Sequence, residues 1–362
     1  MAKETILVTG GAGFVGSNLV ERLLSTRSAR IRIFDNFSRR GVAYNLKWLA
    51  SLADSSRLEI IKGDVRDAEA VRRATSDASE IYHLAAQVAV TTSVDDPVTD
   101  FDINAHGTFN VLEGARLAGR KPFLLFTSTN KVYGSLEAVP VIVNGTRYES
   151  QCADFRGVDE SEQLDFHSPY GCSKGAADQY VRDYARIYGL ESVVFRMSCI
   201  AGPRQFGNED QGWVAHFLYS VLQGEPITVC GSGFQVRDIL HVYDLIDAMT
   251  AVRAHRDYTR GQVFNLGGGL ARTASVIEML RACECRSGRP LHLIYSDVRP
   301  GDQPLYVSDT SKLEAMTGWK PSRSLDDILT SIEDFWRENQ AAISNGSSPA
   351  PSRCAPAFEE VA

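Results

Sequence analysis

The sequence predicts an α/β fold: a doubly wound parallel sheet followed by a smaller mixed α/β C-terminal domain. Through the first half of the chain, short β-branched or apolar runs alternate with longer amphipathic stretches. A glycine-rich turn at residues 10–16 joins the first apolar run to the first amphipathic stretch. After about Arg196 the alternation loosens, and polar segments containing glycine become frequent. Together these observations indicate one large sheet domain and a second, looser unit.

The predicted elements of the first part follow one another in alternation. Short runs rich in β-branched or apolar side chains predict strands at residues 5–9, 31–34, 58–61, 80–83 and 123–128. The amphipathic stretches between them predict helices at residues 13–25, 43–52, 68–74 and 100–118. This order is typical of a parallel sheet that is covered by helices on both faces.

One more helix and one more strand complete the sheet domain. Ser168 suits the N-cap, and Pro169 the first position, of a helix that runs to about residue 188. Residues 190–196 follow as a strand. We therefore expect the sheet domain to span residues 1–196. The second domain is expected at residues 197–340, with some strands returning to the sheet, and a disordered tail rich in Ser, Pro and Ala at 344–362.

The composition is that of an ordinary globular protein, with 362 residues, 44% hydrophobic and 23% charged. A net charge of -7 predicts no basic surface for nucleic acid or anionic lipid. No apolar run reaches about 18 residues, so we expect no membrane span, and no signal peptide is recognised before the first strand. Seven irregularly spaced cysteines indicate reduced thiols and a cytoplasmic protein. His167 and His216 lack clustered partners, so no metal is expected.

The glycine-rich turn has the preceding strand and the following helix that dinucleotide binding requires. Gly10 permits the tight turn, Gly13 lets the backbone approach a pyrophosphate, and Gly16 lets the helix pack close to the sheet. Asp35 stands at the end of the second strand, where a carboxylate would hold the adenosine ribose hydroxyls and repel a 2′-phosphate. NAD is therefore favoured over NADP, although Arg39 lies nearby. The alternative is an ordinary tight turn between a strand and a helix.

Tyr170 and Lys174 are four residues apart at the start of a predicted helix, so they lie on one face, one turn from each other. A free tyrosine has a pKa of about 10. The ammonium of Lys174 and a positively charged nicotinamide ring would both favour the phenolate and lower this pKa. Alone, this spacing also fits a solvated helix face, but the glycine turn in the same chain favours a catalytic pair.

Five motifs occur in the order found in the extended short-chain dehydrogenases with a Rossmann-type sheet, which the chain resembles over roughly residues 4–335. They are Gly10-x-x-Gly13-x-x-Gly16, His83-Leu84-Ala85-Ala86, Asn104-x-x-Gly107-Thr108, Thr129-Asn130-Lys131-Val132-Tyr133-Gly134 and Tyr170-x-x-x-Lys174. That superfamily includes nucleotide-sugar epimerases, dehydratases and decarboxylases. The resemblance implies that Tyr170 takes a sugar hydroxyl proton while a hydride passes to NAD. It also implies that Thr129 hydrogen-bonds the same oxygen and that Lys174 binds the nicotinamide ribose.

The same resemblance extends the cofactor site beyond the three glycines and Asp35. The further residues expected to bind NAD are Phe14, Val15, Asn36, Ser38, Arg39, Asp64, Val65, Leu84, Ala85, Ala86, Asn104, Tyr170 and Lys174.

The two residues after Thr129 discriminate between reactions within this superfamily. The 4,6-dehydratases carry Asp-Glu there, and the decarboxylases acting on UDP-glucuronate carry Glu at the second position. This chain has Asn130 and Lys131. Because neither is a carboxylate, nothing at these positions drives elimination. The simpler outcome is oxidation to a ketone and return of the same hydride to the opposite face, which is the reaction of an epimerase.

Several longer strings resemble the CDP-tyvelose (CDP-paratose) 2-epimerase group, which oxidises C2 of the hexose. They include Asp35-Asn36-Phe37-Ser38-Arg39-Arg40-Gly41, Asp165-Phe166-His167-Ser168-Pro169-Tyr170 and Gly202-Pro203-Arg204-Gln205-Phe206-Gly207. Two positions depart from the group: Met197 replaces a Gln and Ala201 replaces a Tyr. Met removes hydrogen-bonding capacity and Ala opens space, so the sugar is expected to differ from a 3,6-dideoxyhexose or to carry a larger substituent. The alternative is a neutral change in the core or a loop.

A nucleoside-diphosphate hexose is the expected partner. Arg237 and Arg299 are the expected pyrophosphate clamps, since Arg suits bidentate recognition of phosphate. Trp213 and Phe217 are candidates for packing near the base. The complete predicted substrate set is Gln87, Thr129, Asn130, Lys131, Met197, Ser198, Gln211, Val214, Arg237 and Arg299.

These residues favour an NAD-dependent 2-epimerase of a CDP-hexose and leave three alternatives. A UDP-sugar 4-epimerase would use the same Thr129, Tyr170 and Lys174. A decarboxylase or oxidase would stop at the ketone. A scaffold that only binds NAD has no need for a tyrosine base. The family resemblance also implies a homodimer, formed through a four-helix contact that includes residues 100–118 and 169–188.

Overall fold

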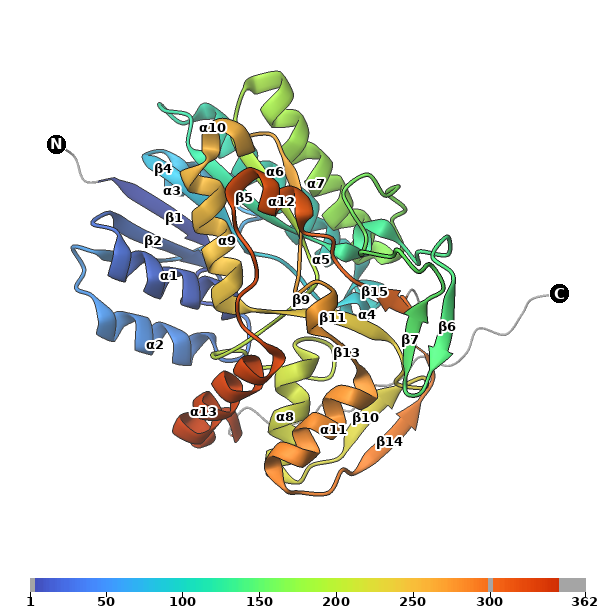
Figure 1. The fold of residues 1–362 in the computed structure, drawn as a ribbon. Helices are drawn as coiled ribbons and strands as arrows, with labels where there is room; N and C mark the ends of the chain where they lie inside the picture. Colours follow the sequence, from blue (N-terminus) through green and yellow to red (C-terminus); the bar gives the residue numbers. More distant parts are fainter. Residues whose placement is uncertain (1–3, 299–301, 345–362) are drawn as a thin grey trace.

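The computed structural model describes residues 4–298 and 302–344, and its centre is a parallel sheet of seven strands (Figure 1). The strand order is β12-β8-β5-β4-β1-β2-β3, and every pair of neighbours is parallel. The predicted doubly wound α/β fold is confirmed. The strands are β1 (Thr5–Thr9), β2 (Arg30–Asp35), β3 (Leu58–Lys62), β4 (Ala78–His83), β5 (Phe123–Thr129), β8 (Glu191–Met197) and β12 (Val263–Leu266).

Helices cover both faces of this sheet because the strands carry apolar side chains on both sides. One face packs against α1 (Phe14–Thr26), α2 (Val42–Leu52) and α9 (Val242–Ala254) in a core that includes Leu19, Leu49 and Leu245. The other face packs against α3 (Ala68–Thr75), α6 (Gly107–Leu117) and α7 (Ser168–Tyr188).

The helix predicted at residues 100–118 is divided in the structure. It consists of α5 (Pro97–Phe101), a π-helical turn η1 (Asp102–His106) and α6. It also starts earlier than predicted, because the side chain of Asp96 accepts a hydrogen bond from the Thr99 amide and Pro97 occupies the first turn. A short helix, α4 (Val90–Asp95), precedes it and was not predicted. π-Helical turns are frequent at functional sites.

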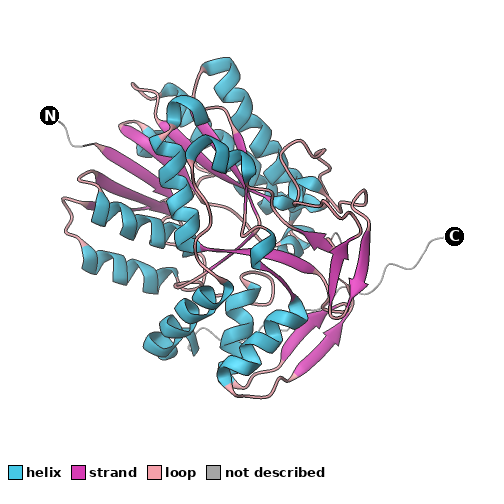
Figure 2. Ribbon diagram, in the orientation of Figure 1, coloured by secondary structure: helices cyan, strands magenta, loops and turns pink. Residues whose placement is uncertain are grey.

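The smaller region packs three helices and several short strands beside the large sheet (Figure 2). Its elements in chain order are β9 (Cys199–Ala201), α8 (Trp213–Gln223), β10 (Ile227–Cys230), β11 (Val236–His241), η3 (Leu270–Arg272), β13 (Thr273–Ser275), α11 (Val276–Ser287), β14 (Leu293–Ser296), β15 (Leu305–Tyr306) and α13 (Leu325–Ser344). Two further short helices, α10 (Arg256–Thr259) and α12 (Ser311–Thr317), pack against α9 and β12 of the large domain. Between β11 and β13, the chain returns to the large domain as α9 and β12. The domain division at residue 196 stays a prediction, and the predicted tail lies, except for its first residue, outside the described residues.

The insert between Gly134 and Ser168 contains an unpredicted hairpin of β6 (Val141–Asn144) and β7 (Arg147–Ser150). Its signal was present in the sequence, since Asn144-Gly145 between two β-branched or aromatic runs is typical of a hairpin turn. Gly145 has a φ of +60°, a conformation that favours glycine.

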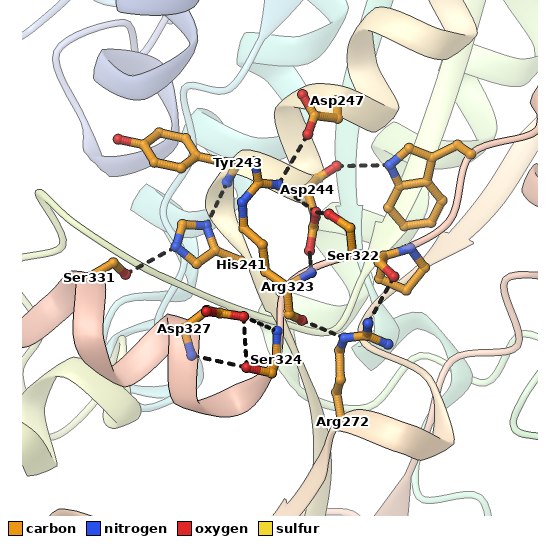
Figure 3. A network of polar contacts seen from close by, with 12 residues as sticks. His241, Tyr243, Asp244, Asp247, Arg272, Ser322, Arg323, Ser324, Asp327 and Ser331 are labelled. Carbon is orange, nitrogen blue, oxygen red and sulfur yellow. Dashed lines mark hydrogen bonds and ion pairs between the residues drawn. The ribbon is translucent and has the colours of Figure 1, made fainter. Parts of the chain in front are cut away.

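A polar network joins α9 of the large domain to the segment between α12 and α13 (Figure 3). The buried carboxylate of Asp244 accepts hydrogen bonds from the Ser322 hydroxyl (2.8 Å), the Arg323 amide (3.0 Å) and the Arg323 guanidinium (2.5 Å). His241, at the end of β11, contacts Ser331 of α13 at 3.0 Å. This network connects the two regions of the chain at one point.

Candidate active site

In doubly wound sheets the crevice that binds a ligand lies where the strand order reverses, which here is at the carboxyl ends of β1 and β4. The chain runs from β1 outward to β2 and β3, and then from β4 outward in the other direction, so the loops after β1 and β4 diverge. The predicted glycine turn follows β1 and Asp35 ends β2. Asp64 and Val65 follow β3, and residues 84–86 follow β4. The structure therefore gathers the predicted cofactor residues at one edge of the sheet.

Two glycines of the turn are required by close packing. A Cβ on Gly16 would lie 2.2 Å from the carbonyl oxygen of Gly10, so only glycine lets α1 begin so near the turn. Gly10 has a φ of +67°, and a Cβ there would lie 2.7 Å from the Ala85 amide. Gly13 caps α1 without a side chain, and Phe14 and Val15 form the first turn. The exposed amides at this helix start suit a pyrophosphate.

Asp35 is half-buried and accepts two backbone hydrogen bonds, from Ala12 at 3.1 Å and Phe37 at 2.9 Å. These bonds join the glycine turn to the loop after β2. Burial raises the pKa of Asp35, while the two amides and the charge of Arg39 oppose that rise. A carboxylate has about four acceptor positions, so Asp35 retains capacity for ribose hydroxyls.

The polar residues that follow β2 and β3 are hydrogen-bonded to one another. The Asn36 side chain donates to Asp64 at 3.1 Å and accepts from the Ser38 hydroxyl at 2.8 Å. The Arg66 guanidinium beside Asp64 holds the pKa of that carboxyl well below its usual range. This loop is thus ordered by its own hydrogen bonds in the protein alone.

Arg39, a predicted cofactor residue, contacts one of the predicted substrate residues. Its guanidinium donates a hydrogen bond to the side chain of Gln211, in the loop before α8. The positive charge of Arg39 also lowers the pKa of Asp35 and of Tyr170. The predicted cofactor and substrate sets therefore meet at this contact.

The three predicted catalytic residues come together from β5 and α7. Thr129 ends β5, and Tyr170 and Lys174 lie on the first turns of α7. The Thr129 hydroxyl is near enough to the Tyr170 phenol to affect its pKa, and it donates a hydrogen bond to the Asn130 side-chain oxygen at 3.3 Å. Ser168 has a φ of +65° and its hydroxyl accepts from the Gly171 amide at 3.2 Å, which is the capping interaction expected of it.

Lys174 is buried and points into the protein. Its ammonium donates to the Thr127 carbonyl at 2.6 Å and lies 4.1 Å from the centre of the Phe126 ring. Burial lowers the pKa of Lys174 to about 7, and the charges of Asp178 and Asp100 oppose this shift.

In the protein without a bound cofactor, the pKa of Tyr170 is not lowered, and the expected lowering in the presence of a nicotinamide ring stays a prediction. Burial, together with the negative charge of Asp100, raises this pKa to about 12, because little solvent reaches the phenolate; the Thr129 hydroxyl and the charge of Arg39 only partly offset this effect. The expectation included the charge of a bound nicotinamide ring, which therefore has to supply most of the lowering.

A group of charged residues lies just beyond Thr129. Asp302 accepts hydrogen bonds from Arg237 at 2.5 Å and from Lys131 at 3.4 Å. Burial and the nearby positive charge of Arg237 lower the pKa of Lys131 to about 8, and the negative charge of Asp302 opposes them. The buried Gln303 accepts from Asn130 at 3.2 Å and donates to the Gly134 carbonyl at 2.6 Å. Two of the predicted substrate cations thus lie together; Arg299 is outside the described residues.

The other predicted substrate residues are placed less uniformly. Met197 ends β8, directly beside Thr129 in the sheet register. The Ser198 hydroxyl donates to the Asp238 carbonyl at 3.0 Å. The Gln87 side chain bonds the backbone of Ala89. The Val214 side chain is only 2% exposed and belongs to the core of the smaller region.

Ala201 and the two predicted base-packing aromatics also lie in that core. Ala201 is 1% exposed and is packed in the core of the smaller region. It therefore does not line an open space, although the absence of a Tyr at this position led us to expect one. The Phe217 ring packs edge-on against Trp213 at 5.4 Å, and the Trp213 indole contacts the Cys199 sulfur at 3.2 Å.

Four residues of this neighbourhood were not predicted to belong to the site. Asp302 and Gln303 follow the predicted clamp Arg299, and the polar string Arg299-Pro300-Gly301-Asp302 was their only signal. Asp100 and Ser173 lie beneath Tyr170 and Lys174. A buried contact between them depends on the packing of α5 against α7, which no local pattern reports. Among the described residues, no group of three or more His, Cys, Asp or Glu side chains is placed to hold a metal ion.

The sequence matches a family model described as GDP-mannose 4,6 dehydratase over residues 7–332. The chain belongs to this family. The predicted membership of the extended short-chain dehydrogenases is thereby confirmed.

Relatives within and around the GDP-mannose 4,6 dehydratase family cover nearly the whole chain. CDP-paratose 2-epimerase of Salmonella typhi is 42% identical over 338 residues, 91% of this chain and 98% of that protein. The structure of UDP-glucose 4-epimerase of Thermus thermophilus with NAD is 31% identical, has a TM-score of 0.74, and covers 92% of this chain and 99% of that one. A dTDP-glucose 4,6-dehydratase structure from Streptomyces venezuelae with NAD bound is 28% identical at a TM-score of 0.80, covering 93% and 98%. The family thus includes epimerases and dehydratases, and the reaction has to be argued from the site.

Proposed function

We propose that this protein is an NAD-dependent epimerase acting at C2 of a CDP-hexose. The observation that carries the proposal is the meeting of Thr129, Tyr170 and Lys174 in one crevice with Asn130 and Lys131 as the next two residues after Thr129. The 42% identity to a CDP-paratose 2-epimerase supports the choice of carbon and nucleotide.

The crevice supports NAD as the cofactor. The amides at the start of α1 would bind the pyrophosphate, and Asp35 would accept from the adenosine ribose hydroxyls. Bound NAD would accept a hydride from the sugar carbon and give it back, and its positively charged ring would favour the phenolate of Tyr170. Asp35 would repel a 2′-phosphate, which supports NAD over NADP.

The protein's own residues would then handle the proton. Tyr170 would take the proton of the sugar hydroxyl as the carbon is oxidised, and the neighbouring Thr129 would hold that oxygen. The keto-sugar would turn in the crevice and present its other face. Tyr170 would return the proton when the carbon is reduced, giving the epimer with no net oxidation.

The residues after Thr129 support epimerisation over loss of water or CO₂. Dehydration of a keto-sugar needs a general acid and base at the adjacent carbons. Here the first position holds the Asn130 amide, bonded to Gln303, and the second holds Lys131, bonded to Asp302. Neither position offers a carboxylate.

Charge complementarity supports a nucleoside-diphosphate substrate. Arg237 and Lys131 share Asp302 in the protein alone, and a diphosphate would be a stronger partner for both cations. We further propose that Arg299 contributes to the same clamp. Met197, beside Thr129, would face the sugar with a thioether in place of an amide.

The test is an NMR product assay with a panel of CDP- and UDP-hexoses in deuterated water. A C2 epimer that contains no solvent deuterium is the expected result, because the hydride returns without exchange. A C4 epimer would instead identify a UDP-sugar 4-epimerase. Accumulation of reduced cofactor or CO₂, with no epimer, would overturn the proposal in favour of an oxidase or decarboxylase.

We also propose that the protein is a cytoplasmic homodimer. Exposed apolar side chains gather on α6 and α7, where Phe109 packs against Tyr180 at 5.9 Å and both remain 39% and 50% exposed. Leu117 and Ile187 on the same two helices are 58% and 66% exposed. A second copy would bury this face, and sedimentation of Phe109→Glu, expected to be monomeric, tests it. No helix of the described residues is long and apolar enough to cross a membrane.

A further inference from the structure

A fully buried carboxylate lies directly beneath the catalytic pair. Asp100, on α5, is 0% exposed, and its carboxylate accepts a hydrogen bond from the Ser173 hydroxyl at 2.5 Å and from the Asn104 amide at 3.0 Å. Ser173 immediately precedes Lys174 and is one turn from Tyr170 on α7. A carboxylate is seldom buried without a function or a charged partner.

A backbone donor determines the orientation of the Asn104 side chain. The Gln87 amide can only donate, and it donates to the Asn104 side-chain oxygen at 3.0 Å. The Asn104 nitrogen therefore faces Asp100 at 3.0 Å and Ser173 at 3.2 Å and donates to both. The Ser173 hydroxyl lies 2.5 Å from the Asp100 carboxylate and 3.2 Å from the Tyr170 carbonyl, so the carboxylate is its nearer acceptor. Burial raises the pKa of Asp100, and the hydrogen bonds from Ser173 and Asn104 and the charge of Lys174 oppose that rise.

No salt bridge neutralises this carboxylate among the residues that the structure describes. The side chains that hydrogen-bond to Asp100 are uncharged, whereas the other buried carboxylate facing Lys174, Asp178, forms a two-pronged pair with Arg196 at 2.9 and 3.0 Å. The charge of Asp178 is therefore compensated locally. The charge of Asp100 acts on Tyr170 and Lys174, raising the pKa of each.

The remaining titratable or charged groups around the pair are few. Thr129 and Arg39 face Tyr170. The buried His83 on β4 faces Lys174, and burial lowers the pKa of its imidazole to about 3, so it is neutral. Thr127 contributes only a backbone carbonyl. Among the described residues, Asp100 is consequently the carboxylate that acts on both Tyr170 and Lys174 and forms no salt bridge, whereas Asp178 acts more strongly on Lys174 but is paired with Arg196.

We propose that Asp100 is a positioning residue for the reaction. Its carboxylate holds the first turns of α7 through Ser173, and its negative charge favours the protonated forms of Tyr170 and Lys174 and so sets the pH range in which the pair is active. The kinetic part of its test rests on the proposed function, and the spectroscopic part does not.

The spectroscopic test follows ionisation of Tyr170 in the NAD-loaded protein by the ultraviolet absorbance of phenolate. The absorbance due to Tyr170 is obtained by subtracting, at each pH, the phenolate absorbance of the same protein carrying Tyr170→Phe. Asp100→Asn is expected to move the midpoint to lower pH by on the order of one unit, because a buried negative charge is removed. The control Asp102→Asn removes a half-buried carboxylate from the same turn, outside this cluster, and is expected to cause a much smaller shift.

The kinetic test uses the pH dependence of epimerisation. Asp100→Asn should move both limbs of the profile to lower pH, since both groups lose the same attraction for a proton. Ser173→Ala keeps every charge, so it should leave the limbs in place but lower kcat by about tenfold or more, with little change in KM.

The possible results of these tests distinguish the electrostatic role of Asp100 from its positioning role. An unchanged Tyr170 midpoint in Asp100→Asn, or an equal shift in Asp102→Asn, would overturn the electrostatic role. Full turnover in Ser173→Ala would overturn the positioning role. A shifted midpoint in a protein without epimerase activity would reject the proposed function and keep this inference. If Asp100→Asn does not fold, Asp100→Ser tests the same loss of charge.

Discussion

At the scale of single residues, the chemistry depends on burial as much as on residue type. Tyr170 and Lys174 are 8% and 3% exposed, and burial moves the pKa of the phenol up and the pKa of the ammonium down. Both shifts oppose the ion pair that the reaction needs. The protein alone therefore holds the pair in its uncharged form more readily than solution would, and ligand charge has to activate it.

Tyr170→Phe should reduce turnover by about 100-fold or more, since a general acid–base group of this kind contributes at least that much. NAD should remain bound, because the glycine turn and Asp35 are untouched. Product formation and bound cofactor, measured on the same preparation, check both statements. Undiminished turnover would remove Tyr170 from the mechanism.

Lys174→Met should abolish turnover yet stabilise the NAD-free protein. The pKa of Lys174 is about 7 in the folded protein against an ordinary value of 10.5. Burial of the charged lysine therefore lowers the free energy of unfolding by its full amount below pH 7, and this loss shrinks as the pH rises to about 10.5. A difference of this size corresponds to roughly 4 kcal/mol at neutral pH, and Met keeps much of the apolar stem. Thermal unfolding should show a higher Tm for the variant at pH 7 and a gap that narrows towards pH 10.

The surface variant Lys320→Met serves as the control for this change, because its side chain is 67% exposed. Its Tm should match that of the wild type across the same pH range. A lower Tm for Lys174→Met at pH 7 would show that the bond to Thr127 outweighs the cost of burying the charge.

At the scale of elements, the turn between β1 and α1 depends on interatomic distances that leave no room for a side chain. Gly16→Ala would place a Cβ 2.2 Å from the Gly10 carbonyl and push α1 away from the sheet. We expect a loss of about 2 kcal/mol or more in the free energy of unfolding and weaker NAD binding. Gly119→Ala is the matched control, since a Cβ there meets nothing within 4 Å. Denaturant unfolding and NAD titration of both variants test this, and equal stability of the two would contradict it.

The π-helical turn η1 is the element that local patterns describe least well. Residues 100–118 read as one continuous helix, but the structure inserts a π turn at Asp102–His106, and Asp100 and Asn104 bond each other across its start. The Asn104 amide then reaches both Asp100 and Ser173. Apolar periodicity is nearly the same in both geometries, so it could not distinguish them.

At the scale of the whole molecule, one buried carboxylate joins the two regions of the chain. Asp244→Ala would remove the acceptor of three hydrogen bonds, which Ser322 and Arg323 donate. The Arg323 guanidinium would keep its hydrogen bond to Asp247. Because Asp244 is 1% exposed, we expect a loss of about 2 to 3 kcal/mol, measured from the denaturation midpoint. Asp326→Asn is the control; it breaks an ion pair whose carboxylate is 79% exposed and should change stability by less than about 0.5 kcal/mol. Equal effects of the two changes would contradict this role of Asp244.

The sequence by itself determined the doubly wound sheet, the glycine turn, and the candidates Thr129, Tyr170 and Lys174. These features depend on local spacing: alternating elements, glycines where a Cβ would collide, and two side chains one helical turn apart. The family assignment confirms the fold and the superfamily.

Only the tertiary structure decided what surrounds those residues. The contact of Asp100 with Ser173 spans 73 positions, and that of Asp302 with Arg237 spans 65. The burial of Ala201 and Val214 and the direction of the Tyr170 pKa likewise arise from segments distant in the chain. Burial and electrostatics sum over all neighbours in space, and a linear pattern contains only the neighbours along the chain.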